Sequence, residues 1–180
     1  RQSIVKVAPV DRPTPAVKLT AVSPKSAPVQ QPTITEVAVW IDDASQLGHA
    51  KVQRITDAIA TVNRATQRAG INLKLTTAIT PPTASAAIIL REAGLDELNP
   101  GYLGYAEASP STSSNFGGVA SINQNFNWYL GSEADAIAED QFDYQSVVTH
   151  ELLHLVGLED DFETTDVDYD IMADTLSRGV

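Results

Sequence analysis

Residues 147–162 read VVTHELLHLVGLEDDF, and two histidines lie four positions apart in this stretch, at His150 and His154. On an α-helix, side chains four residues apart stand on the same face, so both imidazoles can point at one ion about 2 Å from each. Glu151 follows the first histidine directly. A carboxylate beside such an ion can accept a proton from a nearby water molecule and pass it on. The stretch therefore predicts a helix that carries a metal site.

The residues around the histidines predict that this helix is buried. Without a metal, the fold would have to bury two histidines and a glutamate with no partner, at a considerable cost in free energy. Metal ligation removes that difficulty, whereas the spacing alone also arises by chance on ordinary helices. The apolar residues that carry the prediction are Leu152, Leu153, Leu155, Val156 and Leu158.

A third ligand is expected just after the helix. Gly157 can adopt positive φ, end the helix and turn the chain back beneath the two histidines. Asp160 lies just beyond that turn, and the chain contains no cysteine, so histidine and carboxylate must hold any metal. Zinc suits imidazole and carboxylate ligands and brings the pKa of a bound water close to neutrality.

The full pattern, H-E-x-x-H-x-x-G-x-x-D, resembles the motif of the metzincin clan of zinc endopeptidases. In that clan the third ligand is usually His and sometimes Asp, at the position of Asp160 here. Residues 170–173, DIMA, are similar to the clan's Met-turn, and Met172 is the only methionine of the chain. The resemblance implies that the chain hydrolyses peptide bonds with Glu151 as general base and acid, and that Met172 supports the zinc site from below.

The order of the expected elements is most similar to the matrixins and their bacterial relatives within this clan. The resemblance implies that LGYA, residues 103–106, forms an edge strand beside the substrate. Leu103 and Gly104 would then offer main-chain hydrogen bonds to an extended substrate, a strand-addition mode of recognition. Tyr105 stands where a ligand of the matrixins' second, structural zinc would be, so no such zinc is expected.

Hydrophobic periodicity predicts a single α/β (α+β) domain of several strands and two long helices. The resemblance to metzincins implies that the strands form a twisted mixed sheet with a zinc cleft along the edge strand. A helical stripe starts after Gly48 and ends before Gly70, and a strand on each side of it suggests a right-handed parallel crossover. The stripe consists of Val52, Ile55, Ile59, Val62, Ala65 and Ala69. The expected strands are 35–43, 71–78, 85–92, 103–109 and 117–129, and the motif helix begins at Asp143.

The domain organisation follows from composition. Residues 1–35 hold most of the prolines and no aromatic residue, which predicts an arm or linker. Residues 36–180 are expected to fold as one domain, and the resemblance implies that this domain is catalytic and metzincin-like. A net charge of −11 argues against a nucleic-acid surface, and no apolar run has the length of a membrane span. We expect a protein or peptide substrate and a monomer, or a module of a larger extracellular protein; the resemblance implies a secreted or cell-surface setting.

Two alternatives stay open. The acidic loop with Asp166, Asp168 and Asp170 begins like an EF-hand, but Ile171 and Ser177 occupy positions that require Gly and Glu, so only a looser calcium site is possible there. The alternative to a peptidase is a non-catalytic module that binds zinc or calcium on a metzincin-like fold and serves adhesion or assembly.

Overall fold

The computed structural model describes residues 34–42, 44–78, 80–82, 87–94, 101–109, 116–133 and 136–158. Four of the sequence predictions lie outside these ranges. They are the third ligand Asp160, the Met-turn with Met172, the acidic loop from Asp166 to Asp170, and residues 1–33 of the arm. The predicted arm and the first predicted strand overlap at Thr35, which belongs to the strand.

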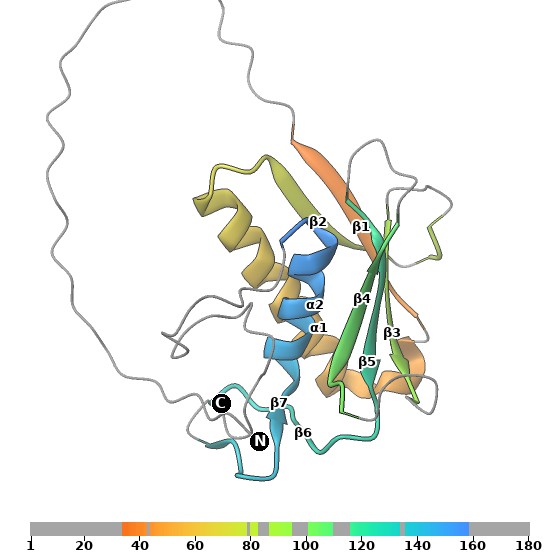
Figure 1. Ribbon diagram of the computed structural model, residues 1–180, viewed down its shortest axis with the longest axis vertical. Helices are drawn as coiled ribbons and strands as arrows, with labels where there is room; N and C mark the ends of the chain where they lie inside the picture. The colour runs from red at the N-terminus through yellow and green to blue at the C-terminus, as the bar shows by residue number, and fades with distance from the viewer. Residues whose placement is uncertain are drawn as a thin grey trace, which may run out of the picture.

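The fold is built on a five-stranded sheet in the order β2-β1-β3-β5-β4 (Figure 1). β1, β2, β3 and β5 run parallel to one another, whereas β4 pairs antiparallel with β5 and forms one edge. This confirms a mixed, mainly parallel sheet. The strands are β1 (Thr35–Ile41), β2 (Leu73–Ala78), β3 (Ala87–Ala93), β4 (Gly104–Ala108) and β5 (Gly118–Asn123).

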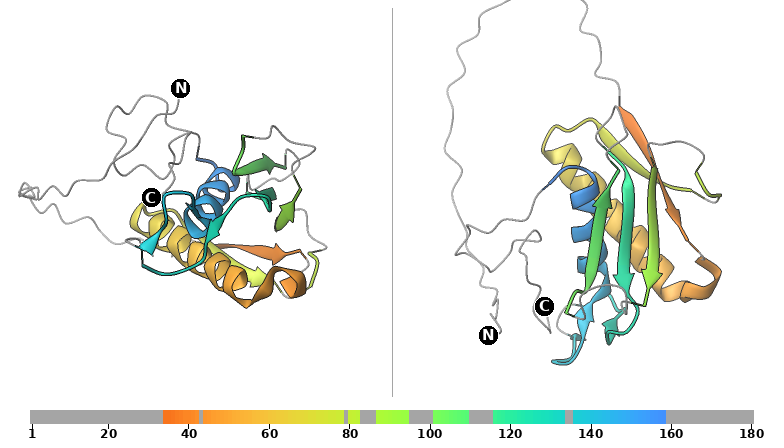
Figure 2. Two further views of the ribbon diagram at one scale, coloured as in Figure 1. Left: turned by 90° about the horizontal axis from the view of Figure 1, so that it is seen from below. Right: turned by 45° about the vertical axis from the view of Figure 1, so that its right-hand side comes forward.

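Two helices pack against one face of the sheet. α1 (Ala44–Arg68) connects the parallel strands β1 and β2, and α2 (Tyr144–Leu155) lies against β4 and β5 (Figure 2). α1 begins before the predicted start, but its backbone breaks at Gly48, where φ is 76°. Gly70, at φ 73°, follows the end of α1 as predicted. Neither helix in the described part of the chain is both long and apolar enough to cross a membrane.

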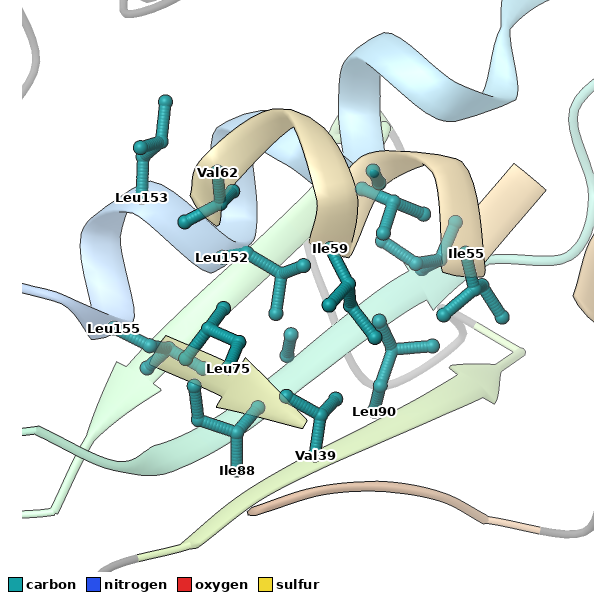
Figure 3. Close-up of a cluster of buried hydrophobic side chains, with 14 of the residues drawn as sticks. Val39, Ile55, Ile59, Val62, Leu75, Ile88, Leu90, Leu152, Leu153 and Leu155 are labelled. Atoms are coloured by element: carbon teal, nitrogen blue, oxygen red, sulfur yellow. The ribbon is translucent and has the colours of Figure 1, made fainter. Parts of the chain in front are cut away.

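The core fills the space between the helices and the sheet. Figure 3 shows Leu152 of α2 pointing into the cluster, between Ile59 of α1 and Leu75 of β2. Burying one such aliphatic side chain stabilises the fold by roughly 1.5–3 kcal/mol. Among the described residues, the hydrophobic side chains with no exposed surface are Val37, Val39, Ile55, Ala58, Val62, Ile88, Leu90, Ala120, Ile122, Tyr144, Val148 and Leu152.

Four details differ from the sequence predictions. Leu158, predicted to be buried with the motif helix, follows the turn at Gly157 and is 37% exposed. Ala65 and Ala69, predicted for the buried stripe of α1, are exposed, and Thr66 is buried instead. Thr66 can be buried because its hydroxyl donates to the Val62 carbonyl, which satisfies the polar group inside the helix. Ile71 precedes β2 and is 40% exposed. The predicted strand 117–129 is interrupted by a turn, so that β6 (Trp128–Tyr129) is separate and pairs with β7 (Phe142–Asp143).

The two edges of the sheet are treated differently. At the β2 edge, the side-chain amide of Asn63 on α1 donates to the Leu75 carbonyl at 2.9 Å and accepts from the Leu75 N–H at 2.7 Å. The amide thus takes the place of a neighbouring strand and protects this edge against pairing with another chain. At the opposite edge, no strand of the described residues pairs with the outer side of β4.

The Asn63 contact predicts a measurable loss of stability. Asn63→Ala leaves a backbone donor and acceptor of β2 without their partners, and we expect the free energy of unfolding to fall by about 1–3 kcal/mol. Urea unfolding followed by circular dichroism measures this difference. Gln67→Ala, an exposed change on the same helix, is the control and should alter the free energy by less than about 0.5 kcal/mol. Equal effects of the two substitutions would contradict the assigned role.

Candidate functional site

The sequence at both ends of α2 explains where this helix starts and stops. Asp143 caps the helix: its carboxylate accepts from the Ser146 backbone N–H at 2.8 Å and from the Ser146 hydroxyl at 2.6 Å. At the other end Gly157 has φ 95°, as predicted for a residue that turns the chain out of the helix. These two ends set which residues of the motif lie on a helical face.

The first turn of α2 is held by an aromatic cluster. The Tyr144 ring lies edge-on to Trp128, with centroids 5.3 Å apart, and the Lys51 ammonium lies 5.6 Å from the Tyr144 ring centre. Burial raises the pKa of the Tyr144 hydroxyl well above its ordinary value, and the nearby Glu92 carboxylate raises the pKa further. Tyr144 is therefore a neutral anchor, and Glu92 itself is paired with Lys51 at 2.6 Å.

The two motif histidines converge. The Nε2 atoms of His150 and His154 lie 3.0 Å apart, and their rings are nearly perpendicular, at 89°. Nδ1 of His154 lies 3.0 Å from the Leu158 carbonyl. A carbonyl only accepts, so Nδ1 is the donor in this contact, and Nε2 is the ring nitrogen left to face His150. The turn at Gly157 brings that carbonyl to the histidine, because it returns the chain toward the last turn of α2.

This arrangement fits a zinc ion. Two nitrogens about 2 Å from an ion with tetrahedral geometry stand roughly 3.3 Å apart, close to the observed separation. A ring N–H donated to a backbone carbonyl is also the usual support of a metal-bound histidine, since it fixes the tautomer. Within the described ranges no third His, Asp or Glu completes a metal-binding group with this pair. The expected third ligand, Asp160, lies outside these ranges.

Glu151 is buried between α2 and the edge strand β4. Its side chain is packed so closely against Gly104 that a Cβ at position 104 would lie 2.5 Å from Oε1 and 2.8 Å from Cγ of Glu151. The residue is only 5% exposed. Gly104 therefore contributes to the site by leaving room for the Glu151 side chain, a role that the sequence prediction did not include.

A second contact joins α2 to the sheet near the far end of β4. The Leu155 carbonyl, in the last turn of the helix, accepts a hydrogen bond from the Gly117 backbone N–H at 3.2 Å. This satisfies one of the carbonyls that a helix end leaves without a partner. Together with the Glu151 contact at Gly104, it holds the face of α2 that carries the motif alongside the edge of the sheet.

The pairing of β4 with β5 decides which backbone groups face outward. Leu103 accepts at its carbonyl from the Asn123 N–H, and Ser109 donates its N–H to the Gly117 carbonyl. In an antiparallel pair, alternate residues bond to the same neighbour, so odd-numbered residues here face β5. Of the two residues predicted to bond a substrate through their main chain, Leu103 directs its carbonyl to Asn123, whereas Gly104, like Ala106, directs its backbone groups away from β5.

Asn123 is a positioning residue that the sequence prediction missed. Its side-chain amide donates to the Tyr102 carbonyl at 3.1 Å, and its backbone N–H bonds to the Leu103 carbonyl at 2.9 Å. The residue is 3% exposed and lies at the end of β5. These bonds fix where β4 begins and therefore where Gly104 lies. The only signal in the sequence was an asparagine in turn-forming surroundings, which does not identify such a partner.

The close approach of Glu151 to Gly104 predicts coupled effects on stability. Gly104→Ala should destabilise the protein by about 1–3 kcal/mol, because the added methyl overlaps the buried glutamate side chain. In a Glu151→Ala background the overlapping atoms are gone, and the same substitution should cost less than about 0.5 kcal/mol. Urea unfolding of the four proteins of this double-mutant cycle gives the coupling. Additive effects would show that the glycine does not accommodate the glutamate.

The site thus combines elements that are far apart in the sequence: α2 carries the histidines and Glu151, β4 carries Gly104, and Asn123 of β5 locates the start of β4. Compared with known proteins, the chain matches no protein-family model and no curated protein.

Proposed function

We propose that this chain is a zinc-dependent endopeptidase of metzincin type. The observation that carries the proposal is the convergence of His150 and His154, with Nε2 atoms 3.0 Å apart, on the helix that also buries Glu151 against the edge strand. The mixed sheet with an antiparallel edge strand beside the motif helix agrees with the architecture that the resemblance to metzincins implies. The sequence contributes the remaining parts, Asp160 as third ligand and Met172 in a Met-turn.

The ligand set sets the chemistry. His150, His154 and Asp160 would hold the zinc ion, and two histidines with one carboxylate form a catalytic set known from other zinc peptidases. When bound, zinc supplies Lewis acidity at the scissile carbonyl and acidifies a water molecule. The hydrogen bond from His154 to the Leu158 carbonyl keeps this ring in the tautomer that a ligand requires.

Glu151 would move the proton. It accepts a proton from the water molecule that attacks the scissile carbonyl and delivers this proton to the departing amine nitrogen, so that proton and charge balance in the reaction. The burial of Glu151 beside Gly104 supports this role, because close packing holds the carboxylate in a fixed position relative to the reacting atoms.

The outer edge of β4 would bind the substrate backbone. Gly104 and Ala106 direct their N–H and C=O groups away from β5, and an extended peptide can pair with them as an added strand. Gly104 would then have two roles, since it bonds the substrate through its backbone and makes room for Glu151. We also propose, from the resemblance alone, that the protein acts at the cell surface or after secretion, on protein or peptide substrates.

Replacing Glu151 separates metal binding from catalysis. Glu151→Gln keeps the size of the side chain and removes the base, so we expect an unchanged zinc content and a loss of casein cleavage by about 10²- to 10⁴-fold. Elemental analysis and release of labelled fragments measure the two properties. His150→Ala is the matched comparison and should lose zinc as well. A wild-type protein that binds zinc but leaves casein uncut would favour the non-catalytic module instead.

The third ligand is tested by two neighbouring aspartates. Asp160→Ala should weaken zinc binding by more than the roughly 10- to 100-fold that loss of an outer-shell partner costs, whereas Asp161→Ala should change it little. Both substitutions remove the same charge one position apart, so electrostatic effects at a distance cancel in the comparison. Competition with a fluorescent zinc chelator gives both affinities. Equal losses, or a larger loss for Asp161→Ala, would contradict the predicted ligand.

A further inference from the structure

The open edge of β4 presents side chains as well as backbone groups. The Cβ direction of Gly104 points toward Glu151 on α2. Because side chains alternate along a strand, Tyr105 and Glu107 point to the other face of the sheet. Tyr105 is 43% exposed, and Glu107 is exposed too. These two side chains stand two residues apart at the edge where a peptide would add.

We propose that this edge selects extended peptides that carry Lys or Arg two residues before an aromatic residue. In such a complex the basic residue lies opposite Glu107 and the aromatic residue lies opposite Tyr105. The proposal rests on the proposed function, because it defines the substrate class of the same site. Net charge adds to the selection, since a protein of charge −11 attracts cationic peptides over a distance.

The register of β4 explains why these two positions govern recognition. Tyr105 and Glu107 bond to β5 through their backbones, so an added strand bonds to Gly104 and Ala106 and faces Tyr105 and Glu107 in non-hydrogen-bonded pairs. Such pairs bring the side chains closest together, with Cβ atoms about 4.5–5.5 Å apart. Opposite charges and aromatic pairs at that distance stabilise a sheet, whereas like charges destabilise it.

Glu107 is suited to an external partner. In the described part of the chain, no Lys or Arg forms an ion pair with it: the three ion pairs there join Lys51 to Glu92, Arg54 to Asp57 and Lys74 to Glu36. A cationic residue of the peptide can therefore meet Glu107 without displacing a described partner.

The direction of the peptide fixes the order of the two residues. Antiparallel pairing is slightly more stable per residue than parallel pairing, so the peptide runs against β4. Its chain then passes Glu107 first, Tyr105 second and reaches Gly104, beside Glu151, last. The basic residue consequently precedes the aromatic residue, and both lie on the amino-terminal side of the peptide bond next to Glu151.

The experiment uses the full chain with Glu151→Gln, so that binding is measured without cleavage. Three fluorescent peptides of equal length contain Lys-Ala-Tyr, Glu-Ala-Tyr or Tyr-Ala-Lys at their centre, and fluorescence anisotropy gives their Kd values. We expect Lys-Ala-Tyr to bind roughly fivefold more tightly than Glu-Ala-Tyr at low salt, with the difference shrinking as salt is raised. Glu107→Lys should reverse this preference, and Tyr105→Ser should weaken the binding of both Tyr-ended peptides.

Glu139→Lys, on an exposed residue outside β4, is the control with the same change of net charge, and it should leave the preference in place. The proposal is overturned if Glu-Ala-Tyr binds as well as Lys-Ala-Tyr, if Glu107→Lys keeps the original preference, or if Tyr-Ala-Lys binds most tightly. If the wild type cleaves casein at sites that show no preference for a preceding Lys or Arg, the peptide-selection proposal is overturned and the proposed peptidase function is not. Charge-selective binding without cleavage supports it and rejects the peptidase instead.

Discussion

The contact between Glu151 of α2 and Gly104 of β4 is the constraint on which the candidate site depends. A carboxylate in this position loses most of its contact with water, so the surroundings must hold it in place and provide its interactions. The glycine provides the space, and the bond from Gly117 to the Leu155 carbonyl keeps the helix at this distance from the sheet. The histidines lie on the same helix, so their place relative to the edge strand follows from the same contact.

The asymmetry of the two sheet edges follows the same logic. An unpaired edge is a hazard, because its free N–H and C=O groups can pair with any extended chain. At β2 the Asn63 amide removes that hazard, whereas at β4 the exposed Glu107 limits which chains can pair. A charge at an edge is a common protection against aggregation, and the same charge can select a peptide of opposite sign. Protection and recognition are thus two consequences of one side chain.

The strands and helices were largely predictable, because the period of the apolar residues shows which face of an element is buried. Val37, Val39 and Ile41 alternate as a strand with one buried face requires, and the structure buries all three. Prediction from apolar periodicity fails where a polar side chain is buried with its hydrogen bonds satisfied. Thr66 is buried because its hydroxyl bonds within the helix, while the apolar Ala65 beside it stays exposed. The pattern of apolar residues does not show such a local hydrogen bond.

For the site, the local features were predictable and the contacts between distant segments were not. His150, Glu151 and His154 are local in sequence, and helical spacing was enough to bring the two imidazoles together. Gly104 was predicted for its backbone groups alone, because its packing against Glu151 depends on how α2 lies against β4. Asn123 could not be recognised at all, because its role depends on the register between β4 and β5, which no short segment encodes. That register also decides that Ala106, and not Leu103, faces outward.

Two parts of the chain would have separate roles in the site. The residues that would hold the metal and move the proton lie on α2 and the turn after it, whereas the groups that face an added peptide lie on β4. Tyr105 and Glu107 point away from α2, so changes at either position leave the histidines and Glu151 untouched. Peptide selectivity can therefore vary by substitution on the strand while the reaction stays the same. The exception is Gly104, where any larger side chain would move Glu151, so that this position links recognition to catalysis.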